Sequence, residues 1–491
     1  MIRWARQYHD RTSYDRASMT GGHLDWFNQP DVYKRYPTAR VIPFPRDMLL
    51  PRWELRDLLG SQPTGEVPEP LDFPVLAGLL RLACAITARV RHSGGDFHYR
   101  STPSAGALYP CELYLWASGV RGLAPGLYHY SLLEQGLVEL RSAKQDPGST
   151  GAHLILFITS IFFRSAWKYR ERAYRYSLLD AGHLLENVLL GLRALGLPYR
   201  VTCDFQDQEV NRFLGLREEL EACLVAVKVG GEPGPLRVPL DFPEPPPQAM
   251  EVAPRQEVVP FIHEAHRITC QSARSQSGHL DMAPQLGLHP REETVVGTLE
   301  SWPPSLQYPD VLFARRSKRA YAERPMPRQG FTALLESLEM GNDVMDAVPP
   351  WACVAVGLLV GAVEGLDPGF YLLDRDFKML YRLVRGDLRA RMARVALEQG
   401  WMSRASIQVL LMSNLEALET RLGPRGYRYA MLAAGSLGQR IYLAGTALGM
   451  GACGVGAFYD HEAAGVLGLN GESRLLYLLT VGLVSGSRER C

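Results

Sequence analysis

The chain contains the same long segment twice, 253 residues apart. Tyr174–Leu197 aligns with Tyr427–Met450 without a gap, and 11 of the 24 positions are identical. The register continues into Asp204–Leu216 and Ala457–Leu469, which both end on Leu-Gly-Leu. Solenoid repeats are about 20–50 residues long, so this spacing indicates duplication of a whole domain. We therefore expect the chain to fold as two related units.

A proline-rich segment separates the two copies. Nine prolines lie between Gly230 and Pro260. Proline cannot continue a helix interior or donate to a sheet, so we expect an extended linker here. The predicted organisation is a first domain over 1–232, a linker over 233–260 and a second domain over 261–491.

The two halves show the same order of expected elements. Each has a helix, a strand with a Pro-Gly turn, a long apolar helix that is expected to be buried, and a closing strand. The mixture of helices and strands predicts an α+β fold. The expected ranges are Pro74–Arg91, Tyr174–Leu195 and Ala222–Val229 in the first half, and Gln329–Met340, Tyr427–Leu448 and Leu475–Leu483 in the second.

Composition excludes several classes of protein. There are 53 Lys and Arg against 52 Asp and Glu, a net charge of +1 that argues against nucleic-acid binding through phosphate neutralisation. The longest uncharged runs are shorter than the ~18 residues that span a membrane. The eight cysteines form no C-x-x-C pair, which argues against a disulfide framework or a zinc site. The charged start lacks a signal peptide, so a cytoplasmic location is expected.

Two short motifs are candidates for ligand contact. Arg315–Tyr321 reads RRSKRAY and offers guanidinium groups and a hydroxyl just before an expected helix, which is the chemistry that a phosphate needs. The alternative is a solvated basic turn. Pro103–Pro110 reads PSAGALYP, in which Gly106 lets backbone approach a ligand closely. The alternative is an ordinary turn into the next strand.

Three further features were weighed for chemistry. Lys168–Tyr176 reads KYRERAYRY and could handle a proton, although a helix start with exposed charges is the commoner meaning. Gly449–Gly454 fits G-x-G-x-x-G but follows a helix, so it does not predict a dinucleotide site. His183 lies in the long apolar helix and is expected to be a buried, hydrogen-bonded side chain rather than a metal ligand.

Together these motifs resemble the nitroreductase superfamily of flavoproteins, and most closely its SagB-type thiazoline/oxazoline dehydrogenases. The resemblance covers Tyr8–Gly230 and His263–Gly482. It rests on RRSKRAY, on PSAGALYP followed by GLYHY, on KYRERAYRYSLLDAGH and on GVGAFYDHEAAGVLGL. It implies two tandem nitroreductase-like domains that form an intramolecular pseudo-dimer and bind flavin mononucleotide (FMN) between them.

The resemblance also implies roles for individual residues. The FMN phosphate would be held by the arginine-serine motif, joined by a C-terminal arginine, and the flavin ring would lie between backbone of the second half and a loop of the first. Lys168 and Tyr169 would lie over the substrate pocket as candidate bases. The implied cofactor-binding residues are Arg315, Arg316, Ser317, Arg319 and Arg488 for the phosphate, Gly456, Ala457 and Phe458 on one side of the ring, and Pro103, Ser104, Ala105 and Gly106 on the other.

Each half lacks what the other keeps. Pro51–Phe73 contains no arginine-serine motif, and the second half has no PSAGALYP. Arg421 and Leu422 stand where the first half has Lys168 and Tyr169. The losses are complementary, so the resemblance implies one composite FMN site. The histidines form no H-x-x-x-H set on an expected helix, so no metal is expected.

The resemblance implies hydride transfer at flavin N5, with dehydrogenation of a thiazoline or oxazoline in a modified peptide and a partner protein that delivers the peptide. Two alternatives stay open from the sequence: a general NAD(P)H-dependent nitro or quinone reductase of small molecules, and a non-catalytic flavoprotein scaffold. A fused pseudo-dimer is compatible with either a monomer or a homodimer.

Overall fold

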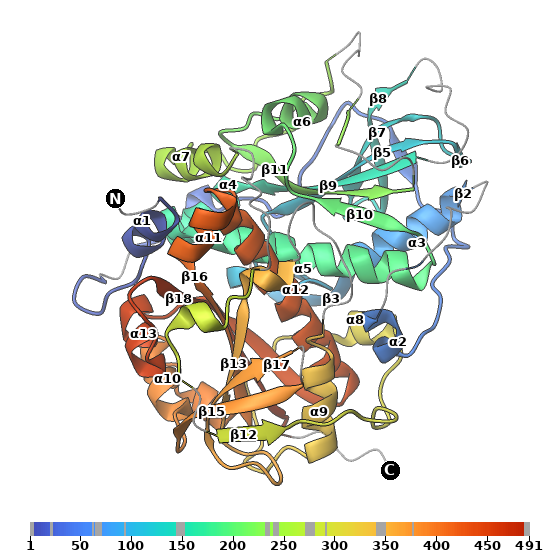
Figure 1. The fold of residues 1–491 in the computed structure, drawn as a ribbon. Helices are drawn as coiled ribbons and strands as arrows, with labels where there is room; N and C mark the ends of the chain where they lie inside the picture. Colours follow the sequence, from blue (N-terminus) through green and yellow to red (C-terminus); the bar gives the residue numbers. More distant parts are fainter. Residues whose placement is uncertain are drawn as a thin grey trace.

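The computed structural model describes residues 4–19, 23–60, 63, 71–92, 95–143, 153–230, 236–238, 245–270, 280–289, 292–339, 350–375 and 378–485. Each half of the chain builds a seven-stranded sheet, and the two sheets have the same topology (Figure 1). The order is β1-β8-β7-β5-β9-β11-β10 in the first half and β12-β15-β14-β13-β16-β18-β17 in the second. All neighbouring strands within these sheets are antiparallel. The predicted α+β duplication is thus confirmed.

The strands of the first sheet are β1 (Val41–Pro43), β5 (Cys111–Ser118), β7 (Gly126–Ser131), β8 (Gly136–Ser142), β9 (His153–Ile161), β10 (Tyr199–Thr202) and β11 (Glu221–Val229). Those of the second are β12 (Glu292–Val295), β13 (Ala355–Val360), β14 (Gly369–Asp374), β15 (Met379–Arg385), β16 (Ile407–Asn414), β17 (Met450–Val455) and β18 (Ser473–Leu483). The long uncharged runs of the sequence form the buried strands β9, β13 and β18.

Two long helices form the centre of the molecule. They are α5 (Ala173–Ala194) and α12 (Gly426–Ala447), and they lie between the two sheets (Figure 1). They cross at Gly182 and Gly435, where the backbones approach so closely that a Cβ on either glycine would lie 2.2 Å from a carbonyl oxygen of the other helix. Nearly every residue of both helices is buried, because each faces its own sheet on one side and the other helix on the other.

The two halves exchange their N-terminal arms. Helix α1 (Trp4–Arg11) of the first half lies beside α11 (Leu415–Leu422) of the second (Figure 1), where Glu419 accepts from the backbone N–H groups of Trp4 and Ala5 at 3.1 and 2.7 Å. Helix α7 (Pro260–Thr269) of the second half packs on α5, with Thr269 hydrogen-bonded to Tyr174 at 2.7 Å. Each arm therefore fastens one half to the other.

One expected element is wrong in part. The predicted helix Pro74–Arg91 is present only as α3 (Phe73–Ala83), and the chain then forms a hairpin of β3 (Ile86–His92) and β4 (Gly95–Arg100). Ile86, Thr87 and Val90 are β-branched, and such side chains favour a strand over a helix.

The remaining α-helices are α2 (Leu55–Leu59), α4 (Phe162–Tyr169), α6 (Asp207–Leu214), α8 (Asp310–Ala314), α9 (Arg328–Glu336), α10 (Arg389–Val395) and α13 (Asp460–Leu467). Among the described residues, none of the helices combines the length and apolar character that crossing a membrane requires.

Candidate active site

A pocket of about 750 Å³, part of it open to solvent, lies between the two halves. The pocket is lined by residues that the sequence analysis singled out and by others that it missed. The predicted residues are Pro103, Ser104, Ala105, Gly106 and Tyr169 from the first half and Ser317, Arg319, Gly456 and Ala457 from the second; the others include Tyr176, Leu179, Asp180 and His183 of α4–α5 and Gln399, Trp401, Tyr442, Cys453 and Tyr477.

The wall from the first half is a short loop with unusual backbone geometry. Gly106, Ala107 and Tyr109 all have positive φ, of 63°, 55° and 45°. Only the first is a glycine, and a non-glycine residue with positive φ is strained unless its surroundings hold it. Helix α5 supplies a hold: Ser104 Oγ donates to the Asp180 carboxylate at 2.5 Å, and the N–H of Ala105 points to the same carboxylate at 3.4 Å.

The Lys168–Tyr169 pair ends α4 directly above this loop. A Cβ placed on Gly106 would lie 2.7 Å from Tyr169 Oη and 3.4 Å from Lys168 Nζ, so both polar ends converge on the glycine. The Tyr169 ring packs on Tyr176 with centroids 4.5 Å apart, and burial raises the pKa of Tyr169. Lys168 itself is exposed.

The arginine-serine motif does not begin a helix, contrary to expectation. Arg315 ends α8 and the chain then runs extended, with Ser317 bridged to Ala452 beside the second sheet. Because β17 is the edge strand of that sheet, its backbone offers the pairing positions that the motif uses. Ser317 Oγ is hydrogen-bonded to Tyr442 Oη at 2.9 Å. Tyr442 Oη also accepts a hydrogen bond from the backbone N–H of Gly454 at 2.7 Å. Helix-start N–H groups are therefore not part of this wall.

The two leading arginines of the motif lie behind the wall rather than on it. Arg315 is buried and donates to the backbone oxygens of Ser101 and Arg100 at 2.6 and 2.9 Å. Its Nη1 is buried and has no hydrogen-bond partner among the described residues. Arg316 donates to the backbone oxygens of Phe313, Arg315 and Thr87. Only Arg319 of the three places its side chain in the lining.

The glycine-rich wall comes from the end of β17. Gly456 O accepts from Tyr176 Oη at 3.1 Å and from Arg172 at 2.9 Å, which fixes the backbone next to Ala457. Phe458 is fully buried, and its ring faces Arg172 rather than the pocket. Gly449 ends α12 with φ of 69°, which fits the expectation that this Gly-rich stretch is no dinucleotide loop. Arg488 lies outside the described residues.

Two buried titratable side chains of α5, Asp180 and His183, face the pocket. Both lie in the segment KYRERAYRYSLLDAGH that carries the resemblance, although no role in a pocket was expected of either. Burial raises the pKa of Asp180 to about 7, against the hydrogen bonds from Ser104 and Ala105. Burial lowers the pKa of His183 to about 3. His183 lies between Gln439 Oε1 and Tyr477 Oη, both at 3.1 Å, and is thus a hydrogen-bonded buried histidine as expected.

Most of the corresponding positions of the other copy are apolar. At the 253-residue offset Asp180 corresponds to Ala433 and Tyr442 to Leu189, and the matching bulges of the closing strands, where the offset is one residue smaller, make Val225 the counterpart of Tyr477. His183 corresponds to Ser436, which donates to Glu186. Glu186 in turn is paired with Arg440 at 2.7 Å, and both are fully buried. The polar lining of the pocket is therefore not repeated around the second copy.

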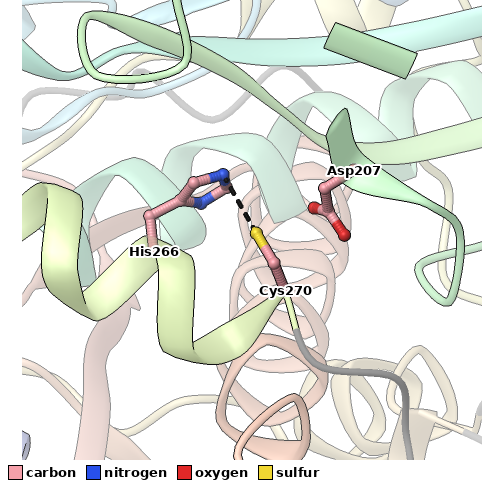
Figure 2. A group of neighbouring side chains, drawn as sticks. All are labelled: Asp207, His266 and Cys270. Atoms are coloured by element: carbon pink, nitrogen blue, oxygen red, sulfur yellow. Dashed lines mark hydrogen bonds between the residues drawn. The ribbon is translucent and has the colours of Figure 1, made fainter. Parts of the chain in front are cut away.

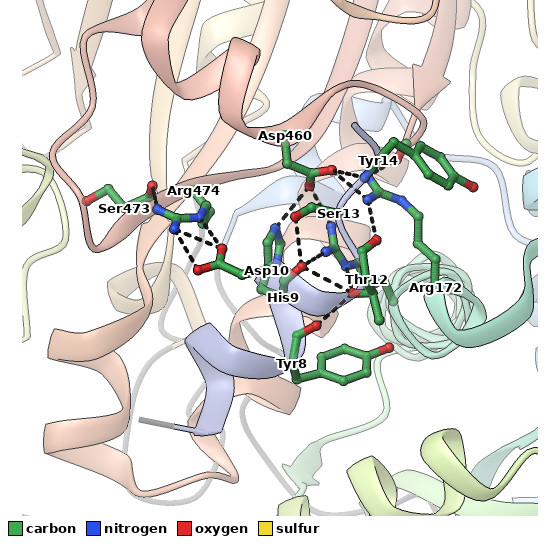
Figure 3. A network of polar contacts seen from close by, with 12 residues as sticks. Tyr8, His9, Asp10, Thr12, Ser13, Tyr14, Arg172, Asp460, Ser473 and Arg474 are labelled. Carbon is green, nitrogen blue, oxygen red and sulfur yellow. Dashed lines mark hydrogen bonds and ion pairs between the residues drawn. The ribbon is translucent and has the colours of Figure 1, made fainter. Parts of the chain in front are cut away.

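Buried arginines and aspartates fix the two halves on either side of the pocket. Arg172 binds Asp460 of the other half at 2.7 Å (Figure 3), and Arg175 binds the same carboxylate at 2.6 Å. His9 of α1 faces the same carboxylate at 3.3 Å. The alternative of exposed charges at a helix start is wrong for Arg172 and Arg175, because both are buried and paired with this carboxylate. It is right for Lys168 and Arg170, which are exposed.

The duplicated counterpart of this cluster is the group drawn in Figure 2. Arg425 and Arg428 bind Asp207 at 2.5 and 2.7 Å. His266 and Cys270 of α7 lie beside that carboxylate, near enough to share a metal ion. Burial alone would raise the pKa of Asp207, but Arg428 and Arg425 outweigh it and lower the pKa. Since the two guanidinium groups already neutralise Asp207, we interpret the cluster as a contact that fixes the N-terminal arm of the second half to the first half, and not as a metal centre.

Comparison with known proteins places the chain. The sequence model of the Nitroreductase family matches residues 67–231 and 312–483. A Methanocaldococcus jannaschii protein named as a nitroreductase is 29% identical over 163 residues, which are 32% of this chain and 82% of that protein. The microcin B17-processing protein McbC of Escherichia coli is 30% identical over 146 residues, 26% of this chain and 52% of McbC. The match thus spans about half of McbC.

A solved structure from Anabaena variabilis, also named as a nitroreductase, matches the whole two-lobed fold. It covers 98% of this chain and 99% of its own, with a TM-score of 0.76 and 24% sequence identity. The family match covers both copies and more than half of the chain. The protein therefore belongs to the nitroreductase family and carries the family's domain twice.

Proposed function

We propose that the protein is an FMN-dependent oxidoreductase with one composite site between its halves, and that it dehydrogenates a thiazoline or oxazoline in a modified peptide. The observation that carries the proposal is the pocket itself, which is assembled from complementary motifs of the two copies. Family membership supports the redox chemistry, and similarity to a peptide-processing protein supports the peptide substrate.

The residues of the pocket fit FMN. Ser317 and Arg319 supply a hydroxyl and a guanidinium group for the phosphate. Arg315 Nη1, buried without a partner among the described residues, is a donor close behind them. The backbone of Gly456 and Ala457 would face one side of the ring, opposite the Pro103–Gly106 loop. When bound, the flavin supplies hydride transfer at N5.

We infer one cofactor per chain rather than two. The positions that correspond to Asp180, Tyr442 and Tyr477 are occupied by Ala433, Leu189 and Val225. A flavin is polar at the phosphate and around the ring edge, and these apolar side chains offer it no hydrogen bonds.

The proton of the substrate would be handled by Lys168 and Tyr169. Burial raises the pKa of Tyr169, so its hydroxyl keeps a proton at neutral pH and is suited to orient substrate or donate a hydrogen bond. Lys168 is the group of the pair that we assign to accept the proton, since its Nζ converges with Tyr169 Oη on Gly106. A partner protein that delivers the peptide is part of this proposal.

The experiment has two stages. Purified protein is first examined by visible absorbance, and released flavin is quantified per chain; about one FMN is expected. Flavin-loaded protein is then given an azoline-containing peptide with oxygen as acceptor, and separately NAD(P)H with a quinone. Loss of two mass units from the peptide supports the proposal. Rapid NAD(P)H oxidation without peptide turnover supports a general reductase, and no flavin binding supports a scaffold.

A further inference from the structure

The loop Pro103–Tyr109 is held in its pocket-facing shape by one side chain of α5. The strain of the loop is concentrated in three positive φ values within four residues, two of them at Ala107 and Tyr109. A conformation of this kind persists only where the surroundings fix it. Specific interactions must therefore hold this loop in place.

The hydrogen bonds of the loop converge on Asp180. Ser104 Oγ donates to Asp180 at 2.5 Å and itself accepts from the N–H of Tyr109 at 2.9 Å, so Ser104 joins the two ends of the loop and ties both to the helix. The N–H of Ala105 points to the second oxygen of Asp180. One carboxylate thus reaches the loop through a side chain and a backbone group.

The duplication supports a specific link between Asp180 and the loop. The second copy has no PSAGALYP, and at the position of Asp180 it has Ala433. The half that keeps the loop keeps the aspartate, and the half without the loop has an alanine in its place.

Asp180 faces no paired cation among the described residues. The titratable groups that act on it or respond to it are Tyr169 of α4, Cys111 of β5 and Tyr477 of β18, and Arg319 lies in the same pocket wall. A carboxyl group buried this deeply without a cation needs hydrogen-bond partners, and those of Asp180 come from the loop, which is consistent with a role in shaping it.

We propose that Asp180 is a positioning residue: through Ser104 and Ala105 it latches the Pro103–Tyr109 loop in the shape that faces the ligand of the pocket. Its effect on the ligand rests on the proposed flavin site, whereas the latch itself does not. The two parts can therefore be tested separately.

The latch is tested by hydrogen exchange on the full chain without flavin. Asp180→Ala and Ser104→Ala should raise exchange of the Ala105 and Tyr109 amides about tenfold relative to the rest of the chain. Asp180→Asn keeps an acceptor and should raise it less. Asn187→Ala is the matched control, because it removes a buried polar side chain of the same helix two turns away. The latch is overturned if Asp180→Ala leaves the exchange of these amides unchanged. It is also overturned if Asp180→Ala raises exchange throughout the chain to the same extent as the control does.

The ligand part is tested by titrating FMN into the same variants and recording the visible circular dichroism of the bound flavin. Weaker binding or an altered signal in Asp180→Ala, with near-normal values in Asp180→Asn and Asn187→Ala, supports the proposal. A loosened loop with unchanged binding and signal overturns the link to the ligand. If the unaltered protein binds no FMN, the proposed function fails while the exchange result still decides the latch.

Discussion

Gly182 and Gly435 are counterparts in the duplicated sequence, and they lie against each other where α5 and α12 cross. A Cβ on Gly182 would lie 2.9 Å from the Cα of Gly435, and the reverse distance is the same. The approximate two-fold axis that relates the halves therefore passes through a contact of two glycine backbones, and the pocket walls on both helices depend on this separation.

Gly182→Ala should destabilise the protein by ~3 kcal/mol or more, because the new methyl group would lie 2.2 Å from the carbonyl oxygen of Leu432 and backbone cannot rotate away. Gly435→Ala should behave alike. Thermal unfolding without flavin measures the effect. Gly465→Ala is the control: no atom lies within 4 Å of its added Cβ, and the change should be neutral or slightly stabilising. Equal melting temperatures for all three would contradict the helix contact.

Arg319→Ala should weaken FMN binding by about tenfold to a hundredfold, since a hydrogen bond to a charged group contributes about 1.5–3 kcal/mol. Fluorescence quenching of free FMN measures the dissociation constant. Lys318→Ala removes the same charge from the neighbouring exposed position outside the pocket lining and should have little effect. Equal weakening by both variants would mean that general positive charge, and not the Arg319 contact, attracts the phosphate.

Tyr169→Phe and Lys168→Met should lower the turnover of peptide by roughly a hundredfold or more while leaving FMN bound, because general acid–base groups contribute about 10²–10⁴ in rate. Single-turnover flavin reduction, followed at 450 nm or so, measures the chemical step. Arg170→Gln, one residue further along and exposed, is the control. Full activity of both variants would assign the proton to another group.

Asp180→Asn should change the pH dependence of stability in a defined direction. Burial raises the pKa of Asp180 to about 7 in the folded protein. Between about pH 4 and pH 7 the folded protein therefore keeps a proton that the unfolded chain has released, and the free energy of unfolding falls as pH rises. The asparagine variant lacks this loss, which amounts to at most about 4 kcal/mol. The melting temperatures of the two flavin-free proteins are measured at each pH. If both change with pH by the same amount across this range, the raised pKa of Asp180 is refuted.

Asp460→Asn should destabilise the protein by about 3–5 kcal/mol, because it leaves Arg172 and Arg175 buried without their carboxylate. Burial alone would raise the pKa of Asp460, but the positive charges of Arg172 and Arg175 outweigh it and lower the pKa. The stabilisation is therefore complete above about pH 4 and is lost as pH falls further. Chemical denaturation measures it, with exposed Asp57→Asn as the control. A small loss in Asp460→Asn would mean that water enters and solvates the arginines.

The sequence predicted the elements whose signal is local or repeated. The long helices begin and end within one residue of the predicted ranges, because apolar periodicity and the repeat agree there. The motif at Arg315 was expected to open a helix and instead follows one, since its partners are strand backbone more than a hundred residues away. Spacing along the chain carries no information about such a partner.

The site residues that were missed share one property. Asp180 and His183 are single polar residues inside an apolar helix, and the motif that contains them assigned neither a place in the pocket. A usable signal existed in the comparison of the two copies, because Asp180 differs from Ala433 and His183 from Ser436. The pairing of Arg175 with Asp460 was equally hidden, although the recurrence of Arg428 and Asp207 at the same offset pointed to a shared structural role.

The Glu186–Arg440 pair has a consequence for how such a chain can change. In a dimer of identical chains every substitution appears at both related sites, so an ion pair that closed one pocket would close the other. Here Glu186 and Arg440 correspond to Gln439 and Asn187 across the repeat, and the two environments differ. Because the two halves are linked in one chain, the two related positions of their interface can carry different side chains. Each half can specialise without the other having to accept the same residue.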